Sequence, residues 1–314
     1  MSWSMRLTIS YSPVYEFLVS LHTYICRKSH KKIDLSVSWA AELQKKLTPE
    51  LEHNLQQIKI DDEWKSTFLL VHLSPQRNSL PQFLAWLEQM SGAALKHLFA
   101  EYSHPFPADI DDFLTRTVRA FKGWYEQYYQ FVDPSIDEAL IHEAAARTSA
   151  LDVMPAELLM DETTNGLVFG AVTEASRLLL VPQYHFQPLN IIYQFDDLIV
   201  CHYNARIYLG DDTLIPTPDL RLIRSLGERS RLKILRYLES GPRTFIEIVR
   251  HLKLSKGITH DHVSNLRKAG LLYAHFEGET LVEYSIRKKA LYQVQDKLLS
   301  YIEQTEATSC STNH

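Results

Sequence analysis

One stretch near the end of the chain places cationic and hydrogen-bonding side chains at helical spacing. In a helix from Ser255 to Gly270, Thr259, Val263 and Leu266 recur at four- and three-residue steps and share an apolar face, although Thr259 could instead face a ligand. Arginine and lysine pair well with guanine and asparagine with adenine, so the other faces suit base edges or phosphates. The candidate contacts are Lys256, Thr259, His260, Ser264, Asn265, Arg267 and Lys268.

A second candidate contact lies at the start of the preceding helix. Thr244 and Glu247 have the Thr-x-x-Glu spacing of a capping box ahead of the apolar residues Ile248 and Val249. The first turn of a helix offers free backbone N–H groups to an anion, and Arg243 adds positive charge beside it. We therefore expect Arg243 and Thr244 to contact phosphate.

Metal binding is the alternative for the histidines of this stretch. His260 and His262 form a His-x-His pair, but residues two apart on a helix point about 200° from each other, and no cysteine lies near them. We expect no metal here and no cofactor elsewhere.

The elements around these residues follow the order of a winged helix-turn-helix. Leu232, Leu235 and Leu238 mark an amphipathic helix that ends at 240–242, a Ser-Gly-Pro run. After Gly270, alternating apolar residues run to a turn at Glu277-Gly278 and return through 282–286, which predicts a hairpin, the wing. The predicted domain covers 219–304.

The chain resembles the ArsR-like (arsenic-repressor) family of bacterial transcriptional regulators over its last quarter to third. The resemblance is carried by the run from Leu226 to Leu235, Leu-Gly-Glu-Arg-Ser-Arg-Leu-Lys-Ile-Leu, and by the spacing from Ser255 to Gly270. It implies a homodimer whose paired recognition helices enter successive major grooves under the control of something sensed elsewhere. The sequence departs from the family at Asp261 and at the acidic wing tip, 277–279, both of which repel phosphate.

Charge is distributed unevenly along the chain. Residues 219–314 hold 16 Lys and Arg against 11 Asp and Glu, whereas residues 1–218 hold 17 against 27. Within 221–268 the count is 12 against 4. Binding to a phosphate backbone requires such a cluster of cations, so double-stranded DNA is the expected partner.

The fold class expected is mostly α, with some β: a helical N-terminal domain at 1–218 with a small β segment at about 166–216, then the winged helix. Helices are predicted over 12–131, and short β-prone runs split by Pro182, Pro188 and 196–197 follow. Asp211-Asp212 leads into a stiff Pro-Thr-Pro linker, and 305–314 reads as a disordered tail.

The large N-terminal domain is where an effector or partner is expected to bind. Arg206 follows a β-prone run and would meet a carboxylate or phosphate, unless it forms an internal salt bridge. An aromatic stripe around Tyr125, on a helix ending near Tyr129, lines a pocket or belongs to the core. The candidate effector residues are Tyr184, His185, His202, Tyr203, Arg206 and Tyr125.

The last helix carries a signal for self-association. Leu291, Val294, Leu298 and Ile302 share one side, which is too apolar for a free end. A two-fold dimer would bind a pseudo-palindrome with half-sites about 34–36 Å apart.

Other classes of function find less support. With 10 glycines in 314 residues there is no phosphate-binding loop or nucleophile elbow, and three scattered cysteines form no metal pattern. Asp109, Asp111 and Asp112 could hold a cation but suit a helix cap better. Neither a signal peptide nor a membrane span is evident, so we expect a cytoplasmic, non-enzymatic repressor with no membrane partner; the alternative is a winged helix that has lost DNA and binds protein.

Overall fold

The computed structural model describes residues 5–35, 37–102, 106–170, 176–209 and 215–303. The Asp211-Asp212 start of the predicted linker and the predicted tail at 305–314 lie outside these residues. The chain divides into two compact units. The first comprises 1–164, 169–207 and 277–280, and the second comprises 165–168, 208–276 and 281–314.

The first unit is built from helices with one sheet. Its helical elements are α1 (Pro13–Ile25), η1 (Arg27–Ser29), α2 (Val37–Lys46), α3 (Pro49–Gln57), α4 (Asp62–Leu73), α5 (Leu80–Glu88), α6 (Gly92–Phe99), α7 (Ile110–Gln127), η2 (Tyr129–Phe131), α8 (Ser135–Leu151) and α9 (Ala156–Thr164). Polar caps fix several starts: Asp61 accepts a hydrogen bond from the Trp64 amide, and Asp109 from that of Asp112. Asp109 is therefore used as a cap, one of the two readings given for the acidic run.

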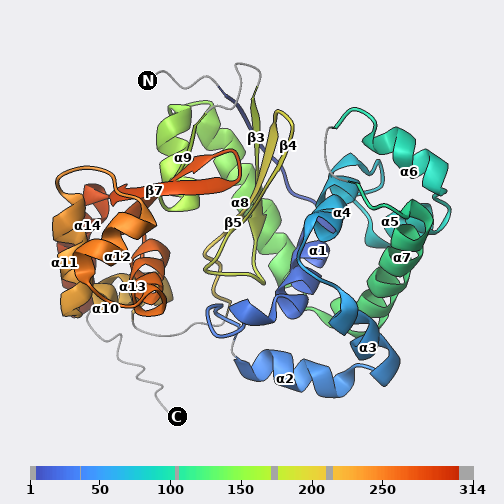
Figure 1. Cartoon of the computed structure of the whole chain (residues 1–314), viewed down its shortest axis with the longest axis horizontal. Coiled ribbons are helices and arrows are strands. Elements are labelled where there is room, and N and C mark those ends of the chain that lie inside the picture. Colours follow the sequence, from blue (N-terminus) through green and yellow to red (C-terminus); the bar gives the residue numbers. More distant parts are fainter. Residues whose placement is uncertain (1–4, 36, 103–105, 171–175, 210–214, 304–314) are drawn as a thin grey trace, which may run out of the picture. The chain divides into compact units, whose positions relative to one another are not determined.

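The sheet of this unit has the order β1 (Arg6–Ile9), β3 (Arg177–Gln183), β5 (Leu198–Asn204), β4 (Ile191–Phe195). β1 pairs with β3 and β3 with β5 in parallel, whereas β4 and β5 are antiparallel. β3 and β5 are buried almost throughout, and both α1 and α8 pack on β3 (Figure 1). Strands buried on both faces read as continuous apolar runs, which is why the 178–181 and 198–201 segments stand out in the sequence.

Helix α1 lies at the centre of the first unit. All of its residues after Pro13 are buried, and its apolar side chains join one large cluster with α3 to α7 and the sheet. Phe17, for example, meets both Phe121 and Tyr129 edge to face. Most of the aromatic stripe on α7 belongs to this core, since Phe121 and Trp124 are both fully buried. Phe121 also borders a hollow lined by residues of α4 and α7.

The second unit has the elements of a winged helix. They are α10 (Thr217–Leu226), α11 (Arg229–Leu238), α12 (Phe245–Leu252), α13 (Lys256–Lys268), β6 (Leu272–Glu277), β7 (Thr280–Ile286) and α14 (Lys288–Ile302). Their apolar faces meet in one core that includes Ile234, Ile248, Val263 and Leu266. The fold class predicted from sequence, mostly helical with small sheets and a winged helix at the C-terminal end, is confirmed.

The wing sheet has a third strand that comes from a distant part of the sequence. β2 (Leu167–Gly170) lies next to β6, giving the order β2-β6-β7. Residues 165–168 accordingly belong to the second unit, where the Arg287 guanidinium donates to Asn165 Oδ1 at 3.2 Å and to the Gly270 carbonyl at 3.1 Å. The sequence indicated β structure from Gly166 onward but not this pairing.

Among the described residues, no helix is both long enough and apolar enough to cross a membrane.

Candidate DNA-binding surface

Side-chain caps fix the starts of α11 and α12 in the second unit, and the sequence predicted the one at α12. The Glu228 carboxylate accepts the Ser230 and Arg231 amides at the start of α11. At the start of α12, Thr244 Oγ1 accepts the Glu247 amide and the Glu247 carboxylate accepts the Thr244 amide, which is the predicted capping box. These bonds fix where each helix starts, because the first turn has no partners within the helix.

A tight turn joins α12 to α13. Lys253 ends α12 in the left-handed conformation, φ 55°, and Ser255 caps α13 by accepting the Ile258 amide. Gly270, φ 72°, follows α13. An added Cβ there would lie 2.2 Å from the Asn165 side chain, so glycine is required for packing as well as for conformation.

The two faces of α13 differ in exposure. Thr259, Val263 and Leu266 are buried in the core, and Thr259 is fully buried, with its hydroxyl unpartnered. Thr259 therefore faces the core and is not exposed to contact a base. Lys256 and His260, one turn apart, are exposed on the N-terminal half of the helix.

The second half of α13 is less exposed. Ser264 and Asn265 are half-buried, as are Arg267 and Lys268. The Arg267 guanidinium donates to the Asn165 carbonyl at 2.7 Å. As a candidate contact to DNA, Arg267 would have to be exposed, whereas here it is half-buried and bonded to a residue about a hundred positions earlier in the chain.

Arg243 and Thr244 lie at the start of α12. The Arg243 guanidinium stacks over Tyr237 with its central carbon 5.1 Å from the ring centre, and it donates to Ser240 Oγ at 3.0 Å. Tyr237 in turn stacks on His251. Thr244 is exposed, but its amide is taken by Glu247, and the hydrogen bond from that backbone amide lowers the pKa of Glu247. A phosphate at this turn would therefore accept hydrogen bonds from the backbone amides that follow Thr244.

Further exposed cations of the second unit were not singled out in the sequence. Arg250 and Lys253 on and after α12 are exposed. On α11, Arg229, Lys233 and Arg236 are exposed as well. The charge count over 221–268 was the only sequence signal for them.

The acidic positions that depart from the ArsR-like pattern have different surroundings. Asp261 is exposed beside His260, with 3.7 Å between its Oδ1 and the His260 Nδ1. At the wing tip, Glu279 groups with the first unit, where its carboxylate accepts hydrogen bonds from Lys65 Nζ at 2.9 Å and from the Gln194 amide at 2.8 Å. Lys65 is buried, so Glu279 neutralises a charge that would be costly to bury alone.

Two of the predicted effector residues belong to a buried hydrogen-bond network. His185 Nδ1 lies 2.5 Å from Glu16 Oε1, and its Nε2 lies 2.8 Å from the Tyr128 hydroxyl. Glu16, also fully buried, accepts the backbone amides of Tyr184 and His185. The network fixes the turn after β3 onto α1 and leaves the His185 ring no free nitrogen.

The other four predicted effector residues are scattered. Both ring nitrogens of His202 are buried and unpartnered, and the Tyr203 hydroxyl donates to Glu143. Arg206 donates to the carbonyls of Glu162 and Thr163 at the end of α9. Tyr125 packs on the main core. None of these residues lines the hollow between α3, α4 and α7.

The fold and this surface define a winged helix-turn-helix. Residues 228–274, from the cap of α11 into β6, match a family model described as bacterial regulatory protein, arsR family. This segment is an ArsR-like helix-turn-helix of the DNA-binding kind found in transcription regulators, as the sequence predicted. No curated protein and no solved structure matches the chain.

Proposed function

We propose that this protein is a sequence-specific transcriptional repressor that binds a pseudo-palindromic operator as a homodimer and responds to an effector held by its first unit. The observation that carries the proposal is the exposed N-terminal half of α13 within an ArsR-like helix-turn-helix. In helix-turn-helix proteins that half of the recognition helix contacts base edges in the major groove.

Each part of the surface then has a role in binding. Lys256, His260 and Asn265 read base edges or the flanking phosphates, and Ser264 adds a neutral hydroxyl. Arg243, held in place by Tyr237, contacts the backbone next to the first turn of α12. Exposed Arg250 and Lys253 supply further charge.

Dimerisation is assigned to α14. Leu291 and Val294 pack on the core of the second unit, whereas Leu298 and Ile302 are 38% and 64% exposed. Apolar exposure at the end of an otherwise packed helix favours a second copy of the same surface.

A salt titration on full-length protein tests the function. We expect affinity for the DNA upstream of the gene to fall by orders of magnitude between low and physiological salt, and to exceed the affinity for a random duplex of equal length throughout. Equal affinity for both duplexes at every salt concentration would refute sequence-specific regulation.

A protein-binding winged helix is the second candidate. Exposed Asp261 and Glu277 favour it, since both repel phosphate. Under this alternative neither duplex binds above background even at low salt, so the same titration separates the two functions.

A further inference from the structure

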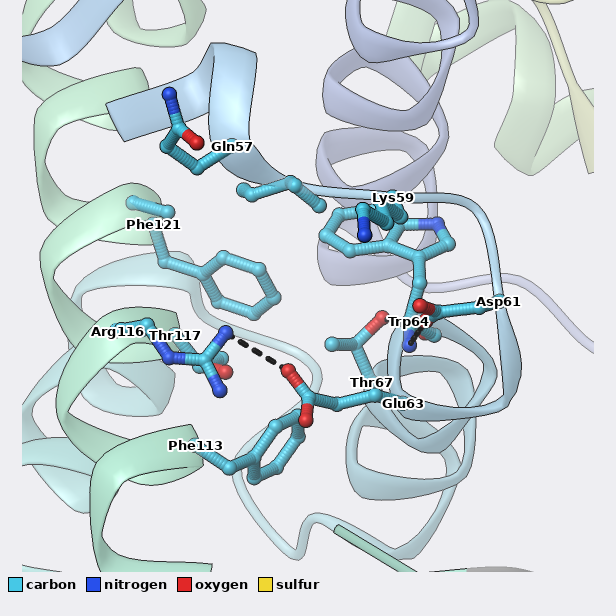
Figure 2. Close-up of a pocket in the computed structure, with 12 residues that line it drawn as sticks. Gln57, Lys59, Asp61, Glu63, Trp64, Thr67, Phe113, Arg116, Thr117 and Phe121 are labelled. Carbon is cyan, nitrogen blue, oxygen red and sulfur yellow. Dashed lines mark hydrogen bonds and ion pairs between the residues drawn. The ribbon is translucent and has the colours of Figure 1, made fainter. Parts of the chain in front are cut away.

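A hollow of about 310 Å³ opens in the first unit between α7 and the segment that joins α3 to α4 (Figure 2). This volume is at the small end of the range for ligand pockets, about 300–1,000 Å³. Its residues are Gln57, Ile58, Lys59, Asp61, Glu63, Trp64, Thr67, Phe113, Arg116, Thr117, Ala120 and Phe121. None of them was a predicted effector residue.

The floor of the hollow is aromatic. Trp64, Phe113 and Phe121 line it. Trp64 and Phe113 are 4% and 2% exposed, whereas Phe121 is fully buried and supports the floor from within the core. Trp64 is held further by its indole N–H, which donates to His22 Nδ1 at 3.0 Å. Two rings fixed in this way, Trp64 and Phe113, offer an aromatic surface to another flat ring.

The charged groups around the hollow divide into those already paired and those that are not. Arg116 Nη1 lies 2.7 Å from Glu63 Oε1 (Figure 2). Arg116 Nε lies 2.7 Å from Asp112 Oδ2. Asp61 is used as the cap of α4. Both carboxylates of the lining therefore have partners, and so does the guanidinium.

Three polar side chains of the lining have no partner among the residues that the structure describes: the ammonium of Lys59 and the amide of Gln57, both exposed, and the hydroxyl of Thr117, a residue that is 7% exposed. An ammonium offers three donors and attracts an anion, and a hydroxyl both donates and accepts. An anionic head is therefore favoured over a cationic one, since the acids that would receive a cation are engaged.

We propose that this hollow binds a small single-ring aromatic carboxylate, with the ring on Trp64 and Phe113, the carboxylate at Lys59 and the Thr117 hydroxyl bonded to a polar atom of the ligand. That this ligand is the effector rests on the proposed function. Binding itself does not depend on DNA.

The test uses full-length protein without DNA and three probes of one shape: phenylacetate, the neutral 2-phenylacetamide and the cation phenethylamine. Isothermal titration calorimetry is expected to rank phenylacetate tightest. Replacing Lys59→Gln should weaken phenylacetate by about three- to tenfold and leave the amide unchanged. Thr117→Val, which keeps the shape, should weaken phenylacetate and the amide together by a similar factor.

The matched control is Lys45→Gln, which removes an exposed lysine of the same unit away from the hollow and should change nothing. The proposal is overturned if no probe binds at millimolar concentration, if phenethylamine binds tightest, or if Lys59→Gln and Lys45→Gln behave alike. If the protein binds no duplex, the proposed function is refuted, but the calorimetric evidence for ligand binding is unaffected.

Discussion

Two histidines of the first unit have opposite environments. His185 has a partner at each ring nitrogen, whereas His202 is 1% exposed and has none. His202 lies instead against the rings of Tyr15 and Phe68, with ring centres 5.6 and 5.2 Å away. Burial lowers its pKa from 6.5 to about 3, and the nearby His22 and His72 act in the same direction.

This environment predicts a dependence of stability on pH. The unfolded chain binds a proton at residue 202 near pH 6.5 and the folded chain only near pH 3, so stability is present above pH 6.5 and is lost as the pH falls toward 3. Replacing His202→Leu should remove up to about 1.4 kcal/mol per pH unit from that slope. Urea unfolding between pH 7 and 4 measures it.

Tryptophan fluorescence is the suitable signal, because all five tryptophans precede residue 165 and report on the first unit. If the free energy of unfolding changes with pH equally in the variant and the parent chain, His202 does not cause the pH dependence. His22, whose pKa burial also lowers to about 3, keeps its own contribution in both proteins.

At the residue scale, the sequence predicts side-chain contacts between residues that are only a few positions apart. Thr244 and Glu247 are three residues apart, so their capping box was visible in advance. The partners of His185 and Arg267 are Glu16 and Asn165, more than a hundred residues away in each case, and no local pattern records such a pairing. The predicted effector residues failed to converge for that reason.

At the element scale, periodicity identified α11 to α14 of the winged helix from their apolar faces. It missed α10, whose first residues, Thr217 and Pro218, belong to the run that the sequence analysis assigned to a linker. It missed β1, a four-residue strand whose register, Arg6 opposite Arg177, joins distant segments. It also missed the pairing of β2 with β6. The hollow was not predicted as a site because its lining comes from α3, α4, α7 and the segment joining α3 to α4, and the aromatic stripe on α7 supplies only Phe121 to it.

The exposed end of α14 makes a prediction about assembly. Changing Leu298→Glu together with Ile302→Glu should convert a dimer into a monomer, because burying two carboxylates in an apolar interface costs more than the contact contributes. Sedimentation velocity measures the change. Both side chains are exposed in the monomer, so the fold should survive.

Gln293→Glu with Gln295→Glu is the control for this change, since it adds the same charge to α14 at exposed polar positions. An unchanged sedimentation coefficient for the Leu298 and Ile302 variant would place the interface elsewhere. Dissociation of the control alone would do the same.

At the scale of the whole molecule, the two units are not simple successive segments. Residues 165–168 belong with the winged helix, and 277–280 belong with the N-terminal part. The charges nevertheless follow the order of the sequence, since the acidic excess lies in 1–218 and the basic excess in 219–314. The charge asymmetry was readable from composition, whereas the exchanged segments depend on strand pairing that composition does not encode.

If α13 binds in the major groove, its exposed side chains should contribute more to DNA affinity than matched side chains elsewhere. The double variant Lys256→Ala with His260→Ala removes two exposed side chains from α13, and Lys45→Ala with His53→Ala removes the same residue types from exposed positions of the first unit. Fluorescence anisotropy with the DNA upstream of the gene should show about tenfold or greater loss of affinity for the first variant and less than about twofold for the second. Equal affinities for the two variants would contradict the account.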